Sequence, residues 1–109
     1  MRVSIVARHR VGGDTRAYAE QRLRRLERHA ALHDASLTID REASRVPEAS
    51  AEVVVHMHHI RLAARCEAPN VREAIDGAVN RADEQVRRRQ ERVAVRKGRT
   101  GADARPPRS

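Results

Sequence analysis

The side chains in this sequence that could do chemistry are mainly arginines. The chain carries 22 arginines against a single lysine, Lys97, and its formal net charge is +8. A guanidinium group is planar and presents a fork of N–H donors, so it binds two oxygens of one phosphate together. The densest run spans residues 81–99, where eight basic residues stand among three acidic ones. This pattern predicts a surface that binds a polyanion.

The class of polyanion follows from what accompanies the arginines. No apolar run approaches the length of a membrane-spanning helix, and the basic run lacks the Trp, Phe and Leu side chains that interfacial helices bury. Charge and arginine content therefore favour nucleic acid, and RNA over DNA. The only aromatic residue, Tyr18, is expected in the core, so bases have no stacking platform. We expect contacts to phosphates and to helical shape instead.

Histidines at positions 56, 58 and 59 form a cluster one expected strand away from Cys66, which raises the question of a metal site. A tetrahedral zinc site needs several such ligands directed at one point. In alternating strands, however, Cys66 points inward while His56 and His58 point outward. Exposed histidines that help to contact phosphate when protonated are the better interpretation. The sequence therefore predicts no metal site.

Catalysis finds little support in the sequence. Cys66 has no obvious base as a partner and is expected to be a small core residue. The Asp and Glu residues are scattered among arginines, where ion pairs on helix surfaces are their expected role. No glycine-rich loop that would cradle a phosphate occurs. We therefore expect no enzymatic activity, no cofactor and no small-molecule substrate.

The sequence also bears on the compartment. It opens directly with a strand pattern and shows no signal peptide. A single cysteine excludes an intramolecular disulfide and fits a reducing environment. We expect a cytoplasmic protein.

The elements that must position the arginines follow from hydrophobic periodicity. Alternating apolar and polar residues predict strands, and apolar residues at a 3–4 spacing predict amphipathic helices. The pair Gly12 and Gly13 marks a turn before the first helix. The expected strands cover residues 2–8, 35–42, 51–58 and 60–67, and the expected helices cover residues 14–30 and 70–97.

The second helix is expected to serve two purposes. Asn70 followed by Glu73 forms a start that is typical of a capping box. Apolar residues recur at helical spacing over residues 71–86, and beyond them the apolar stripe nearly stops. At about 1.5 Å per residue, the helix would run roughly 40 Å, which is longer than the body of so small a domain. Its first half should pack in the core and its second half should project as a basic rod.

The order of these elements predicts the fold class. A β-α-β-β-β-α chain with alternating strands predicts an α+β two-layer sandwich, in which a four-stranded sheet carries both helices on one face. One domain is expected over residues 1–97. Residues 98–109 are rich in Gly, Arg and Pro and are expected to form a disordered basic tail. A monomer is expected because no unused apolar face is apparent.

Several segments resemble one known family, the ribosome hibernation promoting factors and ribosome-associated translation inhibitors. The resemblance covers about residues 1–95 and rests on the order and spacing of its segments. Family members have the same β-α-β-β-β-α order, which is similar to the double-stranded-RNA-binding fold with an added strand. The segments are Val3-Ser4-Ile5 with Arg8-His9, Arg22-Leu23-Arg24-Arg25-Leu26-Glu27-Arg28, the strand at residues 51–57, and Glu67 leading into Ala74-Ile75-Asp76-Gly77-Ala78-Val79, continued by Arg81, Gln85-Val86 and Arg88.

This resemblance implies a stress or stationary-phase protein that binds the small ribosomal subunit. Family members lie in the channel between head and body, where mRNA and the tRNAs would sit, and they block translation by occluding it. Basic residues of the two helices would grip the rRNA backbone. By matching position, the implied RNA-binding residues are Arg22, Arg25, Arg28, Arg81, Arg88 and Arg92, with Arg87 and Arg89 as neighbours.

The sequence also departs from the family pattern. His58-His59 replaces a glycine-containing turn, and Glu84 stands where a basic residue is expected. The tail is short and basic, and there is no second, dimerisation domain, which is typical of a short-type member. Two alternatives are a general double-stranded-RNA-binding or RNA-chaperone module and a protein-interaction module whose basic helix docks an acidic partner. Saturable binding to small subunits would favour the hibernation factor over the general module, and binding that survives nuclease treatment would favour the protein-interaction module.

Overall fold

The computed structural model describes residues 1–8, 10–29 and 31–102, with the side chains of the last helix described as far as Arg92. The element order is the one expected from the sequence, with a short 3₁₀ helix added after the first helix. In chain order, the elements are β1 (Arg2–Ala7), α1 (Gly13–Arg24), η1 (Arg25–Arg28), β2 (Leu32–Arg41), β3 (Ala49–Met57), β4 (Ile60–Ala68) and α2 (Val71–Ala102).

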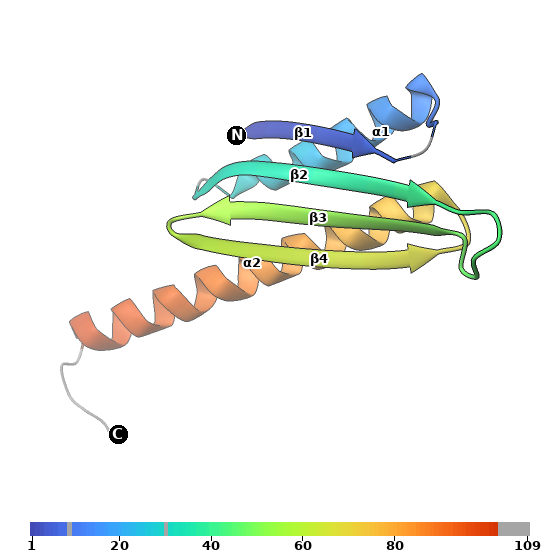
Figure 1. Ribbon diagram of the computed structural model, residues 1–109. Coiled ribbons are helices and arrows are strands. Elements are labelled where there is room, and N and C mark those ends of the chain that lie inside the picture. Colours follow the sequence, from blue (N-terminus) through green and yellow to red (C-terminus); the bar gives the residue numbers. More distant parts are fainter. Residues whose placement is uncertain (9, 30, 103–109) are drawn as a thin grey trace.

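The four strands form one sheet in the order β1-β2-β3-β4. Strand β1 pairs with β2 in parallel, because α1 and η1 carry the chain back across the sheet between them. The other two pairs are antiparallel. Both helices lie behind the sheet on the same face, and α2 runs diagonally behind β3 and β4 and extends beyond the turn that joins them (Figure 1). The predicted α+β two-layer sandwich is therefore confirmed.

The core lies between the sheet and the two helices. On the central strands, Leu37, Ile39, Val53 and Val55 are completely or almost completely buried, as the alternation of each strand predicts. The predicted apolar stripe of α2 is buried from Ala74 onward. Its members and their partners on α1 and η1 are Ala74, Ile75, Ala78, Val79, Ala82, Val86, Ala19, Leu23 and Leu26.

Tyr18 differs from the prediction. It is half-buried at the edge of the core, and its hydroxyl donates a hydrogen bond of 2.5 Å to Oδ1 of Asp76. The Arg72 guanidinium lies over its ring, 4.4 Å from the centroid. Because its hydroxyl group needs a hydrogen-bond partner, a tyrosine often lies at the boundary of the core, with its ring in apolar surroundings and its hydroxyl near solvent. The ring face is thus already occupied by a cation, and it offers no free platform for a base.

Three boundaries differ from the sequence-based expectation. The first helix tightens to 3₁₀ geometry at Arg25 and its last described turn ends at Arg28, which keeps Leu26 in the core. Strand β2 begins at Leu32, earlier than predicted. A bulge between Leu32 and Asp34 interrupts the alternation of buried and exposed residues, so Leu32 and Ala35 are both buried. Strand β3 begins at Ala49, where three consecutive small residues are buried and carry little strand signal. Ala30, the expected end of the first helix, lies outside the described residues.

Helix α2 is longer than predicted. It ends at Ala102, five residues beyond the expected end at Lys97, so the first part of the expected tail is helical. Glycine costs only about 1 kcal/mol in a helix interior, so Gly98 weakens the helix without ending it. The first helix-breaking residue after Asn70 is Pro106. Residues 103–109, the remainder of the expected tail, lie outside the described residues.

Helix α2 lies close to β4 at Gly77. A Cβ atom built on Gly77 would lie 2.2 Å from Sγ of Cys66 and 3.0 Å from its Cβ, which is far inside van der Waals contact. Cys66 therefore points inward, as predicted, and occupies the space that a side chain at position 77 would need. The missing Cβ sets how near the helix can lie to the sheet.

We predict that Gly77→Ala destabilises the protein. Overpacking of this kind costs about 1–3 kcal/mol, which outweighs the roughly 1 kcal/mol that alanine gains over glycine in a helix. Removing the Cys66 thiol eliminates the closer of the two contacts and leaves only the one to its Cβ, so Cys66→Ala/Gly77→Ala should be more stable than Gly77→Ala alone. The measurement is the free energy of unfolding from denaturant titrations followed by circular dichroism.

Gly13→Ala is the matched control for this experiment, because nothing lies within 4 Å of a Cβ built there. It should leave the free energy of unfolding unchanged or slightly raised. A Gly77→Ala protein as stable as the unaltered chain would show that the helix is not held at this contact.

Candidate nucleic-acid interface

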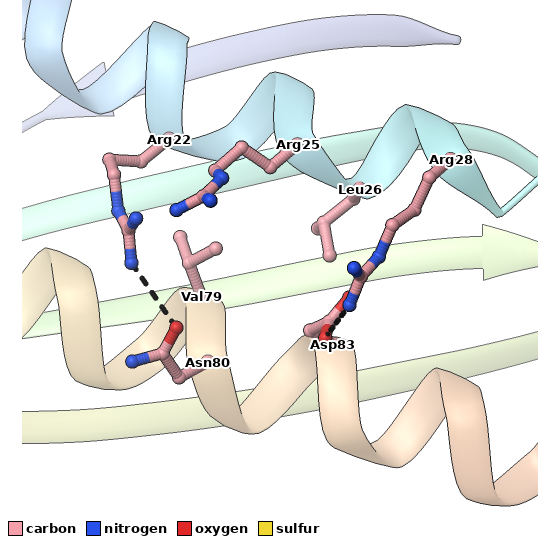
Figure 2. A pocket seen from close by; sticks show the side chains of 7 residues that line it. All are labelled: Arg22, Arg25, Leu26, Arg28, Val79, Asn80 and Asp83. Atoms are coloured by element: carbon pink, nitrogen blue, oxygen red, sulfur yellow. Dashed lines mark hydrogen bonds and ion pairs between the residues drawn. The ribbon is translucent and has the colours of Figure 1, made fainter.

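Three of the predicted RNA-binding arginines meet in a groove between α1–η1 and α2. Arg22, Arg25 and Arg28 lie three residues apart, so successive turns direct them to one side of the helix. Figure 2 shows them reaching toward α2 over an apolar floor formed by Leu26 and Val79. The groove has a volume of about 330 Å³, and its other lining residues are Asn80 and Asp83.

The side of α2 that faces these arginines is polar and acidic. Asp76, Asn80 and Asp83 follow one another at a spacing of four and three residues, which places them on one stripe of the helix. This stripe was not predicted from the sequence. The available signal was the recurrence of these polar residues at helical spacing on α2, alongside arginines that recur every three residues on the opposing helix.

Two of the three arginines are paired across the groove. Nη2 of Arg22 donates to Oδ1 of Asn80 at 3.2 Å, while its Nε lies 2.9 Å from Oδ1 of Asp76 without hydrogen-bond alignment. Nη2 of Arg28 donates to Oδ2 of Asp83 at 2.5 Å. Arg25 is exposed and has no partner among the described residues. Its guanidinium is therefore the one in the groove whose donors are all available to a ligand.

A buried histidine fastens the end of η1 to α2. His29 is only 8% exposed, and both nitrogens of its ring have partners on α2. Nε2 lies 2.8 Å from Oδ1 of Asp83, and Nδ1 lies 3.1 Å from Oε1 of Gln90. Asp83 and Gln90 flank Val86, the last core residue of α2 in the part of the chain that the structure describes, so this contact lies where the helix leaves the core. It therefore fixes the direction in which the projecting part of α2 begins.

Asp83 is the centre of this contact. Burial alone would raise the pKa of its carboxyl group, but hydrogen bonds from His29 and Arg28 outweigh burial and hold the pKa below the ordinary value of 3.8. The carboxylate form is thus favoured in the folded protein. Asp83 serves as the built-in counter-charge of the groove.

The remaining predicted arginines do not share one face of α2. Arg81, Arg88 and Arg92 follow one stripe, whereas Arg87 lies on the stripe of Asp83. Arg89 is partly buried beside the core stripe, and its Nε has no hydrogen-bond partner among the described residues. The structure therefore brings Arg22, Arg25 and Arg28 together and spreads the other five along the helix.

Local partners also differ among these residues. Nη1 of Arg81 donates to the carbonyl of Arg65 on β4 at 2.5 Å, so it is turned away from the groove. Arg88 pairs with Glu84 at 2.6 Å, and Arg87 lies 3.9 Å from the same carboxylate. Arg92 is exposed. Glu84, which departs from the family pattern, therefore neutralises part of the charge on the projecting helix.

The histidines at the other side of the sheet have other partners. His56 is exposed, as predicted, and its Nδ1 lies 2.7 Å from Oδ1 of Asp34 on the neighbouring strand. The rings of His33 and His58 meet edge to face, with centroids 5.3 Å apart. Within residues 1–8, 10–29 and 31–102, no three His, Cys, Asp or Glu side chains converge as metal ligands would.

We predict that Asp83 makes stability depend on pH in the acid range. A carboxyl group whose pKa is lower in the folded state contributes stability above its unfolded pKa and loses it as the pH falls through the folded pKa. The free energy of unfolding should therefore decrease as the pH is lowered past about 4. Asp83→Asn should flatten this part of the profile, whereas Glu91→Gln, at an exposed position on the same helix, should not. Equal profiles for Asp83→Asn and the unaltered chain would contradict the assignment.

Comparison with known proteins places the chain in a family. The family model described as sigma 54 modulation protein / S30EA ribosomal protein matches residues 3–94. A search of curated protein sequences found no match. No helix in the described part of the chain has the combined length and hydropathy needed to cross a lipid bilayer.

Two solved structures share the fold. The N-terminal domain of Thermus thermophilus Protein Y is 26% identical, with a TM-score of 0.69 over 81% of this chain and 98% of that one. A ribosomal subunit interface protein from Coxiella burnetii has a TM-score of 0.73 over 84% of this chain and 99% of that one, at 11% identity. Because the family model spans most of the sequence, the chain belongs to the family of sigma 54 modulation proteins and S30EA ribosomal proteins.

Proposed function

We propose that this protein binds the small ribosomal subunit in the channel for mRNA and tRNA and blocks translation, so that ribosomes hibernate under stress or in stationary phase. The observation that carries the proposal is the groove in which Arg25 presents free donors beside Arg22 and Arg28. Family membership and likeness to a ribosomal subunit interface protein support a ribosomal partner. The protein would act as a cytoplasmic monomer without cofactor or catalytic activity.

The mechanism follows from the geometry of the groove. A phosphate of the rRNA backbone would accept hydrogen bonds from Arg25 first, because this guanidinium gives up no other partner. Arg22 and Arg28 would add charge at the rim while Asn80 and Asp83 hold their orientation. The exposed arginines of projecting α2, Arg87, Arg88 and Arg92, would extend the contact along the backbone. The rigid two-layer body would then fill the space that mRNA and tRNA need.

The general alternative, a double-stranded-RNA-binding or RNA-chaperone module, would use the same arginines. It differs in what it predicts for competition and salt. Non-specific phosphate binding weakens steeply as salt rises, because it depends on counterion release. A two-layer body whose shape fits one channel would also gain contacts that do not depend on salt.

The test is co-sedimentation of the purified protein with ribosomal subunits at moderate and high salt, with duplex RNA as competitor. We expect saturation near one copy per small subunit and resistance to the competitor. Inhibition of translation in a purified system is the second readout. Loss of the protein to competitor RNA would replace the proposal with the general RNA-binding module.

We predict that Arg25→Gln weakens binding to the small subunit about tenfold, which corresponds to about 1.4 kcal/mol for a lost charge-assisted contact. The slope of log affinity against log salt should shrink by about one. Affinities would be measured by filter binding or fluorescence anisotropy across a salt series.

Arg24→Gln is the matched control for Arg25→Gln, because it removes the same charge from the adjacent position. Arg24 points away from the groove and pairs with Glu20 and Glu27, both at 3.2 Å. Its replacement should change the affinity by less than about twofold, since non-specific charge effects on one exposed residue are small. Equal losses for the two variants would mean that total charge, and not the groove, determines binding.

We further predict that Arg88→Glu/Arg92→Glu weakens binding without unfolding the domain. Both side chains lie off the buried stripe, and Arg88 is 69% exposed. Arg2→Glu/Arg61→Glu makes the same change of charge on the open face of the sheet and is the control. Circular dichroism reports folding and co-sedimentation reports binding. Full binding by a folded Arg88→Glu/Arg92→Glu protein would remove the projecting helix from the mechanism.

A further inference from the structure

Both outer strands of the sheet have backbone carbonyls covered by helix side chains. On β1, Nη2 of Arg16 donates to the carbonyl of Ile5 at 2.9 Å. On β4, Arg81 donates to the carbonyl of Arg65 at 2.5 Å, and Nε2 of Gln85 donates to the carbonyl of Ala63 at 3.3 Å. Unpaired strand edges attract other strands, and proteins protect such edges with charged side chains. Because the side chains of Arg81 and Gln85 occupy edge carbonyls of β4, we call these two residues its edge guards.

Apart from the exposed charges of Arg61, Arg65 and Glu67, the edge of β4 lacks the usual features that prevent pairing. The strand is nine residues long, pairs with β3 without a register shift, and contains no proline. In an antiparallel pair, alternate residues direct their N–H and C=O groups to opposite sides. The bonds from Gln85 and Arg81 show that the odd-numbered residues, 61 to 67, face outward. These residues form a straight row of backbone donors and acceptors.

The side chains on β4 favour one self-pairing register. If two copies pair antiparallel about Ala64, Arg61 of each copy lies opposite Glu67 of the other, and opposite charges in this position attract. On the inner face, Leu62 then lies opposite Cys66. Shifting the register by one pair in either direction places Arg61 opposite Arg65 or Arg65 opposite itself, where like charges repel. The central hydrogen-bonded pair of the favoured register joins Ala63 to Arg65.

The central pair needs the two carbonyls that Gln85 and Arg81 now occupy. We propose that the edge of β4 is a pairing surface for a second copy of this chain and that Arg81 and Gln85 keep it closed. Releasing both side chains frees Ala63 and Arg65 for pairing, and the register about Ala64 gives a two-fold symmetric dimer. Arg81 is then a guard of the monomeric state, which is a role apart from the RNA contact implied by its position in the family pattern.

The test compares Arg81→Ala/Gln85→Ala with Gln21→Ala/Arg88→Ala. The second variant removes the same charge and the same side-chain types from exposed or projecting positions and leaves the guards in place. Sedimentation velocity from micromolar to submillimolar concentration gives the mass, and circular dichroism shows that each variant is folded. We expect a dimer for the first variant and a monomer for the control and the unaltered chain.

A cross-link tests the register. In a non-hydrogen-bonded antiparallel pair, Cα atoms lie about 4.5 Å apart, which suits a disulfide. Arg81→Ala/Gln85→Ala is the unguarded variant. Adding Leu62→Cys to it should therefore give a disulfide between the new thiol and Cys66 of the other copy, identified by peptide mapping. Positions 62 and 66 of one strand lie about 13 Å apart and cannot bridge within a copy.

A further variant separates pairing from non-specific association. Ala63→Pro removes an outward N–H donor from an edge strand, where proline is tolerated. Added to the unguarded variant, it should restore the monomer. A folded unguarded variant that stays monomeric overturns the proposal, and so does a dimer that survives Ala63→Pro.

If the unguarded variant fails to fold, slow oxidation of Leu62→Cys in the otherwise unaltered chain at high concentration decides the question. Transient opening of the edge should yield the link between position 62 and Cys66 of the other copy. No link, or a link between the two Cys66 thiols alone, would overturn the proposal.

Discussion

The charged seam between α1–η1 and α2 is the interaction on which the rest of this structure depends. Arg22, Arg28 and His29 on one side meet Asp76, Asn80 and Asp83 on the other, and these contacts align the two helices above the sheet. Exposed ion pairs contribute about 0–1 kcal/mol each. Arg22 and His29 are more buried than the residues of such pairs, but most of the stability still comes from the apolar core. The seam fixes orientation, both of the arginines in the groove and of the helix that projects beyond the sheet.

The same seam limits how strongly the groove attracts anions. Asp83 holds its negative charge within reach of Arg28, so part of the positive potential is cancelled before any ligand arrives. A single flexible phosphate must compete with that carboxylate, whereas a backbone that also touches Arg25 and projecting α2 gains several contacts at once. In the proposed function, an arrangement of this kind would discriminate between a shaped RNA surface and loose strands, because preorganised donors favour the partner that fits all of them.

Much of the fold could be predicted from the sequence, since alternation and helical spacing report burial directly. The buried stripe of α2 from Ala74 to Val86 is a clear case. The misplaced boundaries have physical causes that a single period cannot encode. A bulge next to Leu32 changes the alternation of β2, and three small buried residues conceal the start of β3. The end of α2 was placed too early because glycine weakens a helix without ending it.

The site was less predictable than the fold. The resemblance to a known family identified Arg22, Arg25 and Arg28 as a group, and the structure brings them together. The acidic stripe facing them depends on how two helices are aligned whose paired residues lie 55 and 58 positions apart in the sequence, which composition does not reveal. Arg81 shows the same limit, because its partner is a backbone carbonyl on β4 and backbone groups leave no trace in a sequence pattern. Whether the arginines bind RNA stays a prediction.

The central claim is that rRNA enters the groove between the two helices. The most direct measurement is a cryo-electron microscopy structure of the protein bound to the small ribosomal subunit. We predict an rRNA phosphate within hydrogen-bond distance of the Arg25 guanidinium, with the helix layer against the rRNA and the open face of the sheet turned away. A complex in which the sheet face contacts the rRNA and the groove faces solvent would contradict it.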